Sequence, residues 1–280
     1  MLKTATTLVH KGAMDIAVHA ISSFARHFSS THRLEIHTDG SPDAEDHKIL
    51  LEAAAGMDAA IVTSTDRRDA LDAALKDYPM SAELMRRGGY FTKFELPMTV
   101  QRPFFYFDSD IVWLRPVANL EPANKPDVFS TESWSWYYGV KHDAVWIRER
   151  TPRRVNSGFY HLSSPFPYDR FERMVAEDLY TPDHRFSTDQ EMMAFLFPNL
   201  EHYHPEDLKR SRVGVHYDLA SETAAALHFP GRMWLDHMDQ IKTLAETTAG
   251  RQAATIRFTP AVPLDRTELL RMRATLAIAD

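Results

Sequence analysis

The chain has 280 residues, of which 44% are hydrophobic and 25% charged, with a formal net charge of −7 and no cysteine. This length suits one large α/β domain or a core domain with a smaller addition. The lack of cysteine excludes disulfides and thiolate metal sites and agrees with a cytoplasmic location. The negative charge argues against non-specific nucleic-acid binding. No apolar run approaches the roughly 20 residues of a membrane span, and no signal peptide is evident.

Strands and helices are predicted to alternate through the first 110 residues. Short β-rich segments are bounded by turn residues, and helical periodicity fills the intervals between them. Ser81 is predicted to cap a helix that Pro97 ends. The predicted strands cover 4–10, 33–38, 59–63 and 104–107, and the predicted helices cover 13–28, 47–55 and 81–96. This alternation predicts an α/β fold with a parallel sheet and helices on both faces.

The second part of the sequence is richer in aromatic residues and proline. Residues 134–138, 165–168 and 198–205 are predicted to be loops or short elements, and 266–279 a closing helix. Ligands of open α/β sheets bind outside the carboxyl ends of the strands. We therefore expect one ligand at the strand ends of the first part, with further walls supplied by the second.

The strongest functional signal is the segment from Phe104 to Pro116. An apolar strand runs directly into Asp108-Ser109-Asp110, and a second apolar run follows. An Asp-x-Asp pair alone is weak evidence, but two carboxylates at the end of a buried strand place charge at the edge of a cleft. Hard divalent cations bind such oxygens and keep open positions for phosphate oxygens. The alternative is a turn whose Asp side chains only cap backbone amides.

This segment resembles the Asp-x-Asp motif of the GT-A-fold glycosyltransferases, most of all the glycogenin and bacterial galactosyltransferase group. Three further segments follow in the order of that group, namely Asn156-Ser157-Gly158, Asp189-Gln190 and His228-Phe-Pro-Gly231. The resemblance covers roughly residues 4–234 and is loose between the motifs. It implies a GT-A-type, Rossmann-like mixed sheet, mostly parallel and flanked by helices, with an irregular, aromatic-rich acceptor side.

The resemblance also implies a role for each motif. Asp108, Asp110 and His228 are expected to hold Mn²⁺ or Mg²⁺, and Asp189 and Gln190 to be catalytic residues beside the reacting sugar. The donor-binding residues that it implies are Ser109, Asn156, Ser157, Gly158 and Gly231. The group typically continues to Lys-Pro-Trp, whereas Arg232-Met-Trp stands here with shorter spacing. Arg232 is therefore the candidate contact to the diphosphate.

Simpler structural roles are open to several of these residues. Asn156-Ser157-Gly158 can form a plain turn, and Asp189 can cap the helix predicted over 190–197. His216 competes with His228 for the metal, because it also follows a short apolar stretch. We favour His228 because a glycine follows it three residues later.

Other candidates depend on position in the predicted fold. Lys93 lies on the helix before the Asp-x-Asp strand, where the group has a basic residue that reaches the donor; the alternative is a solvated lysine. His10 and Lys11 after the first strand, and Asp39 after the second, are placed near the nucleotide.

An aromatic cluster follows the metal motif. Trp134, Trp136 and Tyr137 are expected to bind the acceptor, because sugars present apolar C–H faces that stack on aromatic rings. The alternative is a cluster that packs in the core or in a lid.

These expectations combine into a metal-dependent glycosyltransferase of hexosyltransferase type. It would move a sugar from a nucleoside diphosphate sugar, with UDP favoured, to a hydroxyl of a glycan, lipid, protein or other acceptor. The resemblance favours retention of configuration, although a carboxylate base could support inversion. The alternatives are a metal-dependent phosphoesterase, which usually needs more carboxylates, and a non-catalytic nucleotide-sugar-binding module.

We expect residues 1–280 to form a single GT-A-type catalytic domain. Its predicted parts are a nucleotide-binding half at 1–117, a donor-sugar and acceptor half at 118–234 and a helical extension at 235–280.

Overall fold

The computed structural model of the chain describes residues 2–87, 91–122, 127–130, 155–176, 193, 196–197, 200–210, 222–231, 233–244, 248 and 250–260. Within these residues, eight strands form one large sheet. Its strands are β1 (Lys3–Val9), β2 (His32–Thr38), β3 (Asp58–Val62), β4 (Phe104–Phe107), β6 (Asp127–Ser130), β7 (Asn156–Leu162), β8 (Leu200–Tyr203) and β11 (Phe258–Pro260). Each of the four strands predicted from the sequence is confirmed to within one residue at either end.

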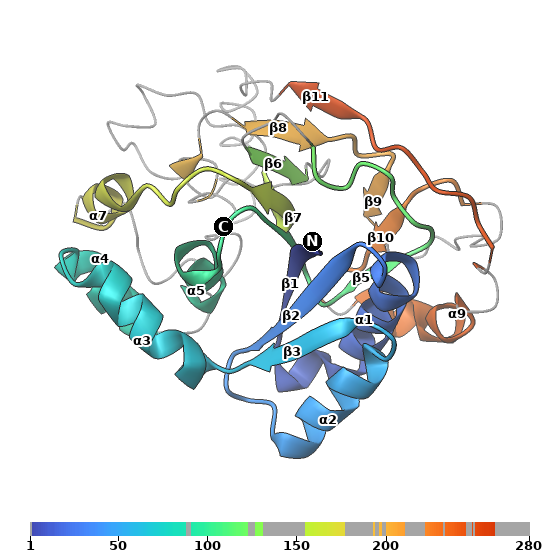
Figure 1. The fold of residues 1–280 in the computed structure, drawn as a ribbon, viewed down its shortest axis with the longest axis horizontal. Helices are drawn as coiled ribbons and strands as arrows, with labels where there is room; N and C mark the ends of the chain where they lie inside the picture. Colours follow the sequence, from blue (N-terminus) through green and yellow to red (C-terminus); the bar gives the residue numbers. More distant parts are fainter. Residues whose placement is uncertain are drawn as a thin grey trace, which may run out of the picture.

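The large sheet is mostly parallel, in the order β11-β8-β6-β7-β4-β1-β2-β3 (Figure 1). β2 pairs in parallel with β1 and β3, β4 with β1, and β8 with β6. β7 runs antiparallel to β4 and β6, and β11 runs antiparallel to β8. The predicted α/β fold with a mixed, mostly parallel sheet is therefore confirmed.

Helices cover both faces of this sheet (Figure 1). On one side lie α1 (Met14–Phe28) and α2 (Ala44–Ala53), and on the other lie α3 (Ser64–Leu75), α4 (Pro79–Arg86), α5 (Thr92–Thr99) and α7 (Tyr168–Ala176). The apolar residues of α1 recur at helical spacing, so that Ala17, Ile21, Phe24 and Phe28 form one buried stripe against the sheet.

The single helix predicted over 81–96 is wrong, because α4 and α5 are two helices. α4 begins at Pro79, where the missing N–H of proline costs nothing, so Ser81 lies inside the helix and does not precede it. The backbone N–H and hydroxyl of Ser81 donate to the Glu172 carboxylate on α7. Pro97 does not end α5, which continues to Thr99.

A small second sheet joins distant parts of the chain. It has the order β5-β10-β9, with β5 (Ile111–Trp113), β10 (Ala226–His228) and β9 (Leu208–Arg210). β10 pairs antiparallel with β5, and His228 lies opposite Ile111. The backbone N–H of Trp113 donates to the buried hydroxyl of Ser23 on α1, which fixes this sheet against the helix.

The region predicted as a helical extension is helical only in part. The 3-10 helix η4 (Met233–His237) and α9 (Met238–Lys242) agree with the prediction, but β11 is a strand that extends the large sheet. Residues 258–260 form a strand and not a helix because they pair with β8. The helix predicted over 266–279 lies outside the described residues, and the division of the chain into parts stays a prediction.

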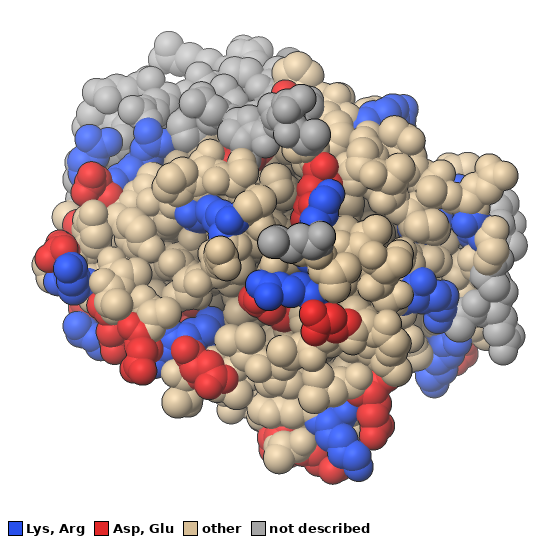
Figure 2. Space-filling view, in the orientation of Figure 1, with Lys and Arg blue, Asp and Glu red and all other residues tan. Residues whose placement is uncertain are grey.

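The described surface is mixed in charge. Figure 2 shows Lys and Arg side chains interspersed with Asp and Glu on this face of the molecule. None of the helices in the described ranges combines the length and the apolar character needed to cross a membrane.

Two buried histidines, on β2 and β7, are expected to make stability depend on pH. Burial and the charge of Lys3 lower the pKa of His32 and of His161 from 6.5 to about 4. Between these values the unfolded chain binds more protons than the folded chain, so stability present above pH 6.5 is lost as the pH falls toward 4. Each histidine should cost about 1.4 kcal/mol of unfolding free energy per pH unit in this window.

Urea unfolding at about pH 7.5 and about pH 5 would measure this loss. His32→Gln and His161→Gln should each reduce the difference between the two conditions. An unchanged difference in both variants would show that the loss of stability comes from other groups.

Candidate active site

Asp108 and Asp110 occupy the short connection between β4 and β5, at the carboxyl end of a central parallel strand. The backbone N–H of Asp108 donates to the carbonyl of Gly158 on β7, at 2.7 Å. The carbonyl of Asp110 accepts from the N–H of Phe229, just after β10, at 3.0 Å. Ser109 between them is buried. The backbone on either side of Ser109 is therefore held by hydrogen bonds to β7 and to the residue that follows β10.

His228 is brought to these carboxylates by the second sheet. Because His228 pairs with Ile111, the residue after Asp110, its imidazole lies beside both acids. Its Nε2 is 3.3 Å from Oδ1 of Asp110 and 4.0 Å from Oδ2 of Asp108. One possible ligand atom from each of the three side chains lies within 4.8 Å of the others. Within the described ranges, this is the one such group of acidic and histidine residues.

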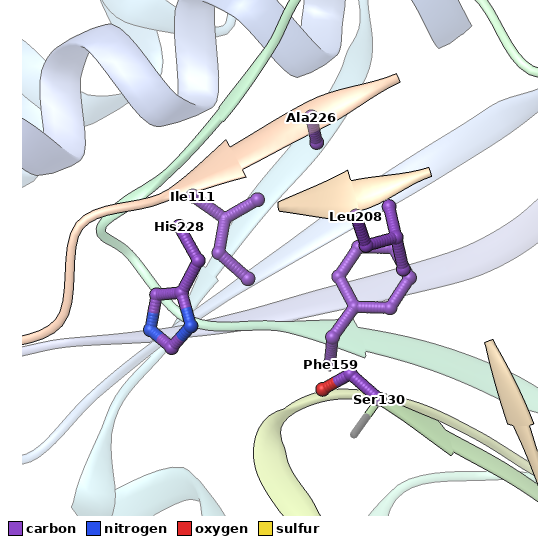
Figure 3. Close-up of a pocket in the computed structure, with 6 residues that line it drawn as sticks. All are labelled: Ile111, Ser130, Phe159, Leu208, Ala226 and His228. Carbon is purple, nitrogen blue, oxygen red and sulfur yellow. The ribbon is translucent and has the colours of Figure 1, made fainter. Parts of the chain in front are cut away.

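The imidazole of His228 also lines a small cavity between the two sheets (Figure 3). The cavity measures about 10 Å³, which is about the space that one water molecule needs. Its other lining residues are mostly apolar and come from β5, β6, β7, β9 and β10, namely Ile111, Ser130, Phe159, Leu208 and Ala226. Packing in this mostly apolar surrounding holds the ring in place.

The segment Asn156-Ser157-Gly158 is the start of β7, so the plain-turn alternative is wrong. Oδ1 of Asn156 accepts a hydrogen bond from the backbone N–H of Gly158 at 2.8 Å. A Cβ at Gly158 would lie 2.7 Å from Oδ2 of Asp108 and 2.9 Å from Cε1 of His228. Only glycine therefore fits between the carboxylate and the imidazole.

Lys93 contacts the same centre from α5. Its Nζ lies 2.8 Å from Oδ1 and 3.1 Å from Oδ2 of Asp108, and 3.2 Å from the hydroxyl of Ser157. Its side chain is only 14% exposed, so the solvated-lysine alternative is wrong. α5 is anchored in turn by Glu95, which accepts from the buried guanidinium of Arg67 on α3 at 2.8 Å.

The two carboxylates differ in their electrostatic surroundings. Burial alone would raise the pKa of Asp108, but the ammonium of Lys93, the imidazole of His228 and the hydroxyl of Tyr106 bring it below the usual 3.8. Burial raises the pKa of Asp110 despite the neighbouring His228, and the charge of Asp108 adds to the rise. A bound cation would offset the cost of burying both negative charges.

Tyr106 belongs to this centre, although it is not among the predicted site residues. Its hydroxyl donates to Oδ1 of Asp108 at 2.5 Å. Its ring stacks on Tyr160 of β7 with centroids 4.6 Å apart, and Nζ of Lys93 lies 5.3 Å from the ring centre. Residues two apart on a strand share a face, so the two-residue spacing from Asp108 was an available signal.

The residues predicted near the nucleotide lie at the carboxyl ends of β1 and β2, and all are exposed. Lys11 forms ion pairs with Asp43, the N-cap of α2, and with Asp46 in the first turn of that helix. Oδ1 of Asp39 accepts from the N–H and hydroxyl of Ser41. The structure thus brings His10, Lys11 and Asp39 to the predicted edge of the sheet, while a role in donor binding stays a prediction.

Gly231 lies in the turn after β10 with a φ of +68°, a backbone conformation that favours glycine. Several predicted residues lie outside the described ranges, so their placement stays a prediction. These are Asp189, Gln190, Arg232, Trp134, Trp136, Tyr137 and the rival His216.

Solved structures share this architecture. The chain is similar to the galactosyltransferase LgtC, solved with donor and acceptor sugar analogues, with a TM-score of 0.52 and 12% identity over 89% of this chain and 97% of that one. It is similar to the bifunctional glycosyltransferase WbbM, with a TM-score of 0.56 and 9% identity, and to the glycosyltransferase GlyE of Streptococcus pneumoniae TIGR4, with a TM-score of 0.53 and 10% identity. The chain has a GT-A fold.

The chain covers 97% of LgtC but only 50% of WbbM and 64% of GlyE. No protein-family model matches the sequence, and no curated protein matches it. In this GT-A fold, the Asp-x-Asp segment stands at the carboxyl end of β4. The Asp-x-Asp motif thus occupies the edge of the sheet at which a ligand is expected.

Proposed function

We propose that the chain is a metal-dependent glycosyltransferase that moves a sugar from a nucleoside diphosphate sugar, with UDP favoured, to an acceptor hydroxyl. The convergence of Asp108, Asp110 and His228 carries this proposal, since their ligand atoms lie within 4.8 Å of one another. The fold supports it, because solved glycosyltransferases share that fold.

The donor set suits Mn²⁺ or Mg²⁺. Two carboxylates and one imidazole are ligands that Mn²⁺ accepts, and the carboxylates also suit Mg²⁺. Oδ1 of Asp110 is buried and faces Nε2 of His228 at 3.3 Å, outside regular hydrogen-bond geometry, so a cation bound by both atoms would satisfy it. When bound, the ion supplies positive charge that stabilises the departing diphosphate.

The remaining residues surround this centre. Lys93 adds positive charge beside Asp108, where the diphosphate would lie. Asp189 and Gln190 are proposed to lie beside the reacting sugar, and the resemblance to a retaining group supports retention of the anomeric configuration. Trp134 with its neighbouring aromatics is proposed to bind the acceptor, and Arg232 the diphosphate.

A thermal-shift screen of the purified chain tests the proposal. UDP-, GDP-, CMP- and dTDP-sugars would be added with Mn²⁺ and with EDTA, because a ligand that binds the folded state raises Tm by mass action. We expect UDP-sugars to raise Tm only with Mn²⁺, and the same mixtures to show slow donor hydrolysis, in which water takes the place of the acceptor hydroxyl. Binding without turnover would favour a non-catalytic module, and hydrolysis of simple phosphate esters would favour a phosphoesterase.

His228→Ala should weaken the affinity for Mn²⁺ by about 10-fold or more, because it removes one of three proposed protein ligands. Calorimetric titration of Mn²⁺ would measure the loss. His216→Ala should have much less effect. If His216→Ala caused the larger loss, the late histidine of the motif would be assigned wrongly.

Lys93→Ala should raise the KM for the donor or lower kcat, and leave the KM for the acceptor nearly unchanged. The variant removes the ammonium next to Asp108, where the diphosphate is proposed to bind. Lys76→Ala, at an exposed lysine that directly follows α3, is the matched control. Steady-state kinetics that show a change only in acceptor KM would move Lys93 out of the donor site.

A further inference from the structure

The hydroxyl of Tyr106 hydrogen-bonds to Asp108, a proposed metal ligand, but is not itself one of the proposed ligands. It donates to Oδ1 of Asp108 at 2.5 Å, a short distance of the kind seen when the acceptor is ionised. Tyr106 is 1% exposed, and beside a carboxylate, which only accepts, its hydroxyl is the donor of the pair.

The ring of Tyr106 has little freedom to move. It stacks on Tyr160 with an interplanar angle of 20°, and the ammonium of Lys93 lies against it. β4, which carries Tyr106, is paired on both sides, in parallel with β1 and antiparallel with β7. The hydroxyl is therefore a fixed point from which the carboxylate of Asp108 can be oriented.

The two oxygens of Asp108 have different surroundings. Oδ1 receives the Tyr106 hydroxyl and lies closer to Lys93, at 2.8 Å against 3.1 Å for Oδ2. Oδ2 faces His228 Nε2 at 4.0 Å and lies against the backbone of Gly158. Lys93 thus contacts both oxygens, Tyr106 donates to Oδ1 alone, and Oδ2 is directed toward the other proposed metal ligands.

We propose that Tyr106 is a positioning residue, which holds Asp108 so that Oδ2 alone is presented to the metal. This inference rests on the proposed function, since it requires a divalent cation between Asp108, Asp110 and His228. A partner that hydrogen-bonds a metal ligand typically changes metal affinity by about 10- to 100-fold when it is removed.

Tyr106→Phe is the test, because it removes the hydroxyl and keeps the stacked ring. Mn²⁺ alone would be titrated against the full-length chain, with free Mn²⁺ followed by electron paramagnetic resonance. We expect Kd to rise by about 10-fold. Sugar transfer should recover toward the wild-type rate at saturating Mn²⁺, because the defect lies in holding the ion.

Tyr203→Phe is the matched control. Tyr203 is also fully buried, and its hydroxyl donates to the carbonyl of Leu120 at 3.0 Å, away from the metal ligands. Its loss should lower Tm by a similar amount and leave the affinity for Mn²⁺ unchanged.

The outcomes separate this inference from the function on which it rests. If the wild-type chain binds Mn²⁺ and Tyr106→Phe binds it equally well, the positioning role is overturned and the proposed function stands. If the wild-type chain binds no Mn²⁺, both are overturned. If Tyr106→Phe fails to fold while Tyr203→Phe folds, the hydroxyl serves the fold, and the positioning role is overturned.

Discussion

Asp110→Asn should lower the rate of sugar transfer by at least about 100-fold and leave the fold intact. The amide keeps the shape of the side chain but takes away the negative charge beside His228 and Asp108. Since burial raises the pKa of Asp110, its ionised form is costly without a cation. The metal-free variant should therefore melt no lower than the wild-type chain, while the rise of Tm with Mn²⁺ is lost.

Initial rates at saturating donor and Mn²⁺, together with Tm with and without the ion, would measure both effects. Asp69→Asn, an exposed aspartate on α3, is the matched control and should change neither. Full activity of the wild-type chain in EDTA would remove the metal from the mechanism. Normal turnover by Asp110→Asn would remove this carboxylate from the centre.

Gly158→Ala should be almost as damaging as the loss of a metal ligand. The added Cβ would lie 2.7 Å from Oδ2 of Asp108, 2.8 Å from Oδ1 of Asn156 and 2.9 Å from Cε1 of His228, and observed Cβ contacts are essentially never this short. Either the carboxylate or the imidazole must move away. We expect Mn²⁺ affinity to fall by at least about 10-fold, as measured by calorimetry, and turnover to fall with it.

A control variant at a second glycine distinguishes an effect on the site from an effect on the stability of the fold. Gly56 has a φ of +84° and open space around its Cα, so Gly56→Ala strains the backbone far from the carboxylates. This control should lower stability by about 1 kcal/mol and leave the affinity for Mn²⁺ unchanged. Equal Mn²⁺ affinity in Gly158→Ala and the wild-type chain would show that the centre tolerates the extra carbon.

The parallel half of the fold could be predicted because its signals are local. The apolar patterns of the strands and of the buried stripe of α1 repeat over a few residues, so a short stretch of sequence is enough to detect them. α3 was not predicted because its segment is mostly polar and buries only Arg67, Leu71 and Leu75, although Thr63 and Asp66 form a reciprocal capping contact at its start. The prediction that Pro97 ends a helix was wrong because α5 tolerates a proline in its interior, and the start of α4 at Pro79 was not predicted.

The residues of the candidate active site also differ in whether the neighbouring sequence identifies them. Asp108 and Asp110 could be identified because a buried strand runs directly into them. The assignment of His228 depended on the resemblance and on the glycine three residues later, because its partners lie far away in the sequence, and in the structure it lies beside the two acids. Tyr106 was not predicted, because it lies in an apolar strand between phenylalanines. Side chains alternate between the two faces of a strand, however, and this alternation puts Tyr106 on the same side as Asp108.

The pairing of β10 with β5 also sets the order in which the centre can be assembled during folding. A chain in which only the first part has folded already holds Asp108 and Asp110, but His228 arrives when β10 closes against β5. More than 100 residues separate β5 from β10 in the sequence, and bringing these strands together costs conformational entropy before their contacts stabilise the pair. The second sheet should therefore form late. Tight Mn²⁺ binding would therefore indicate that the second sheet has formed. A partly folded chain would bind the ion only weakly, through the two carboxylates.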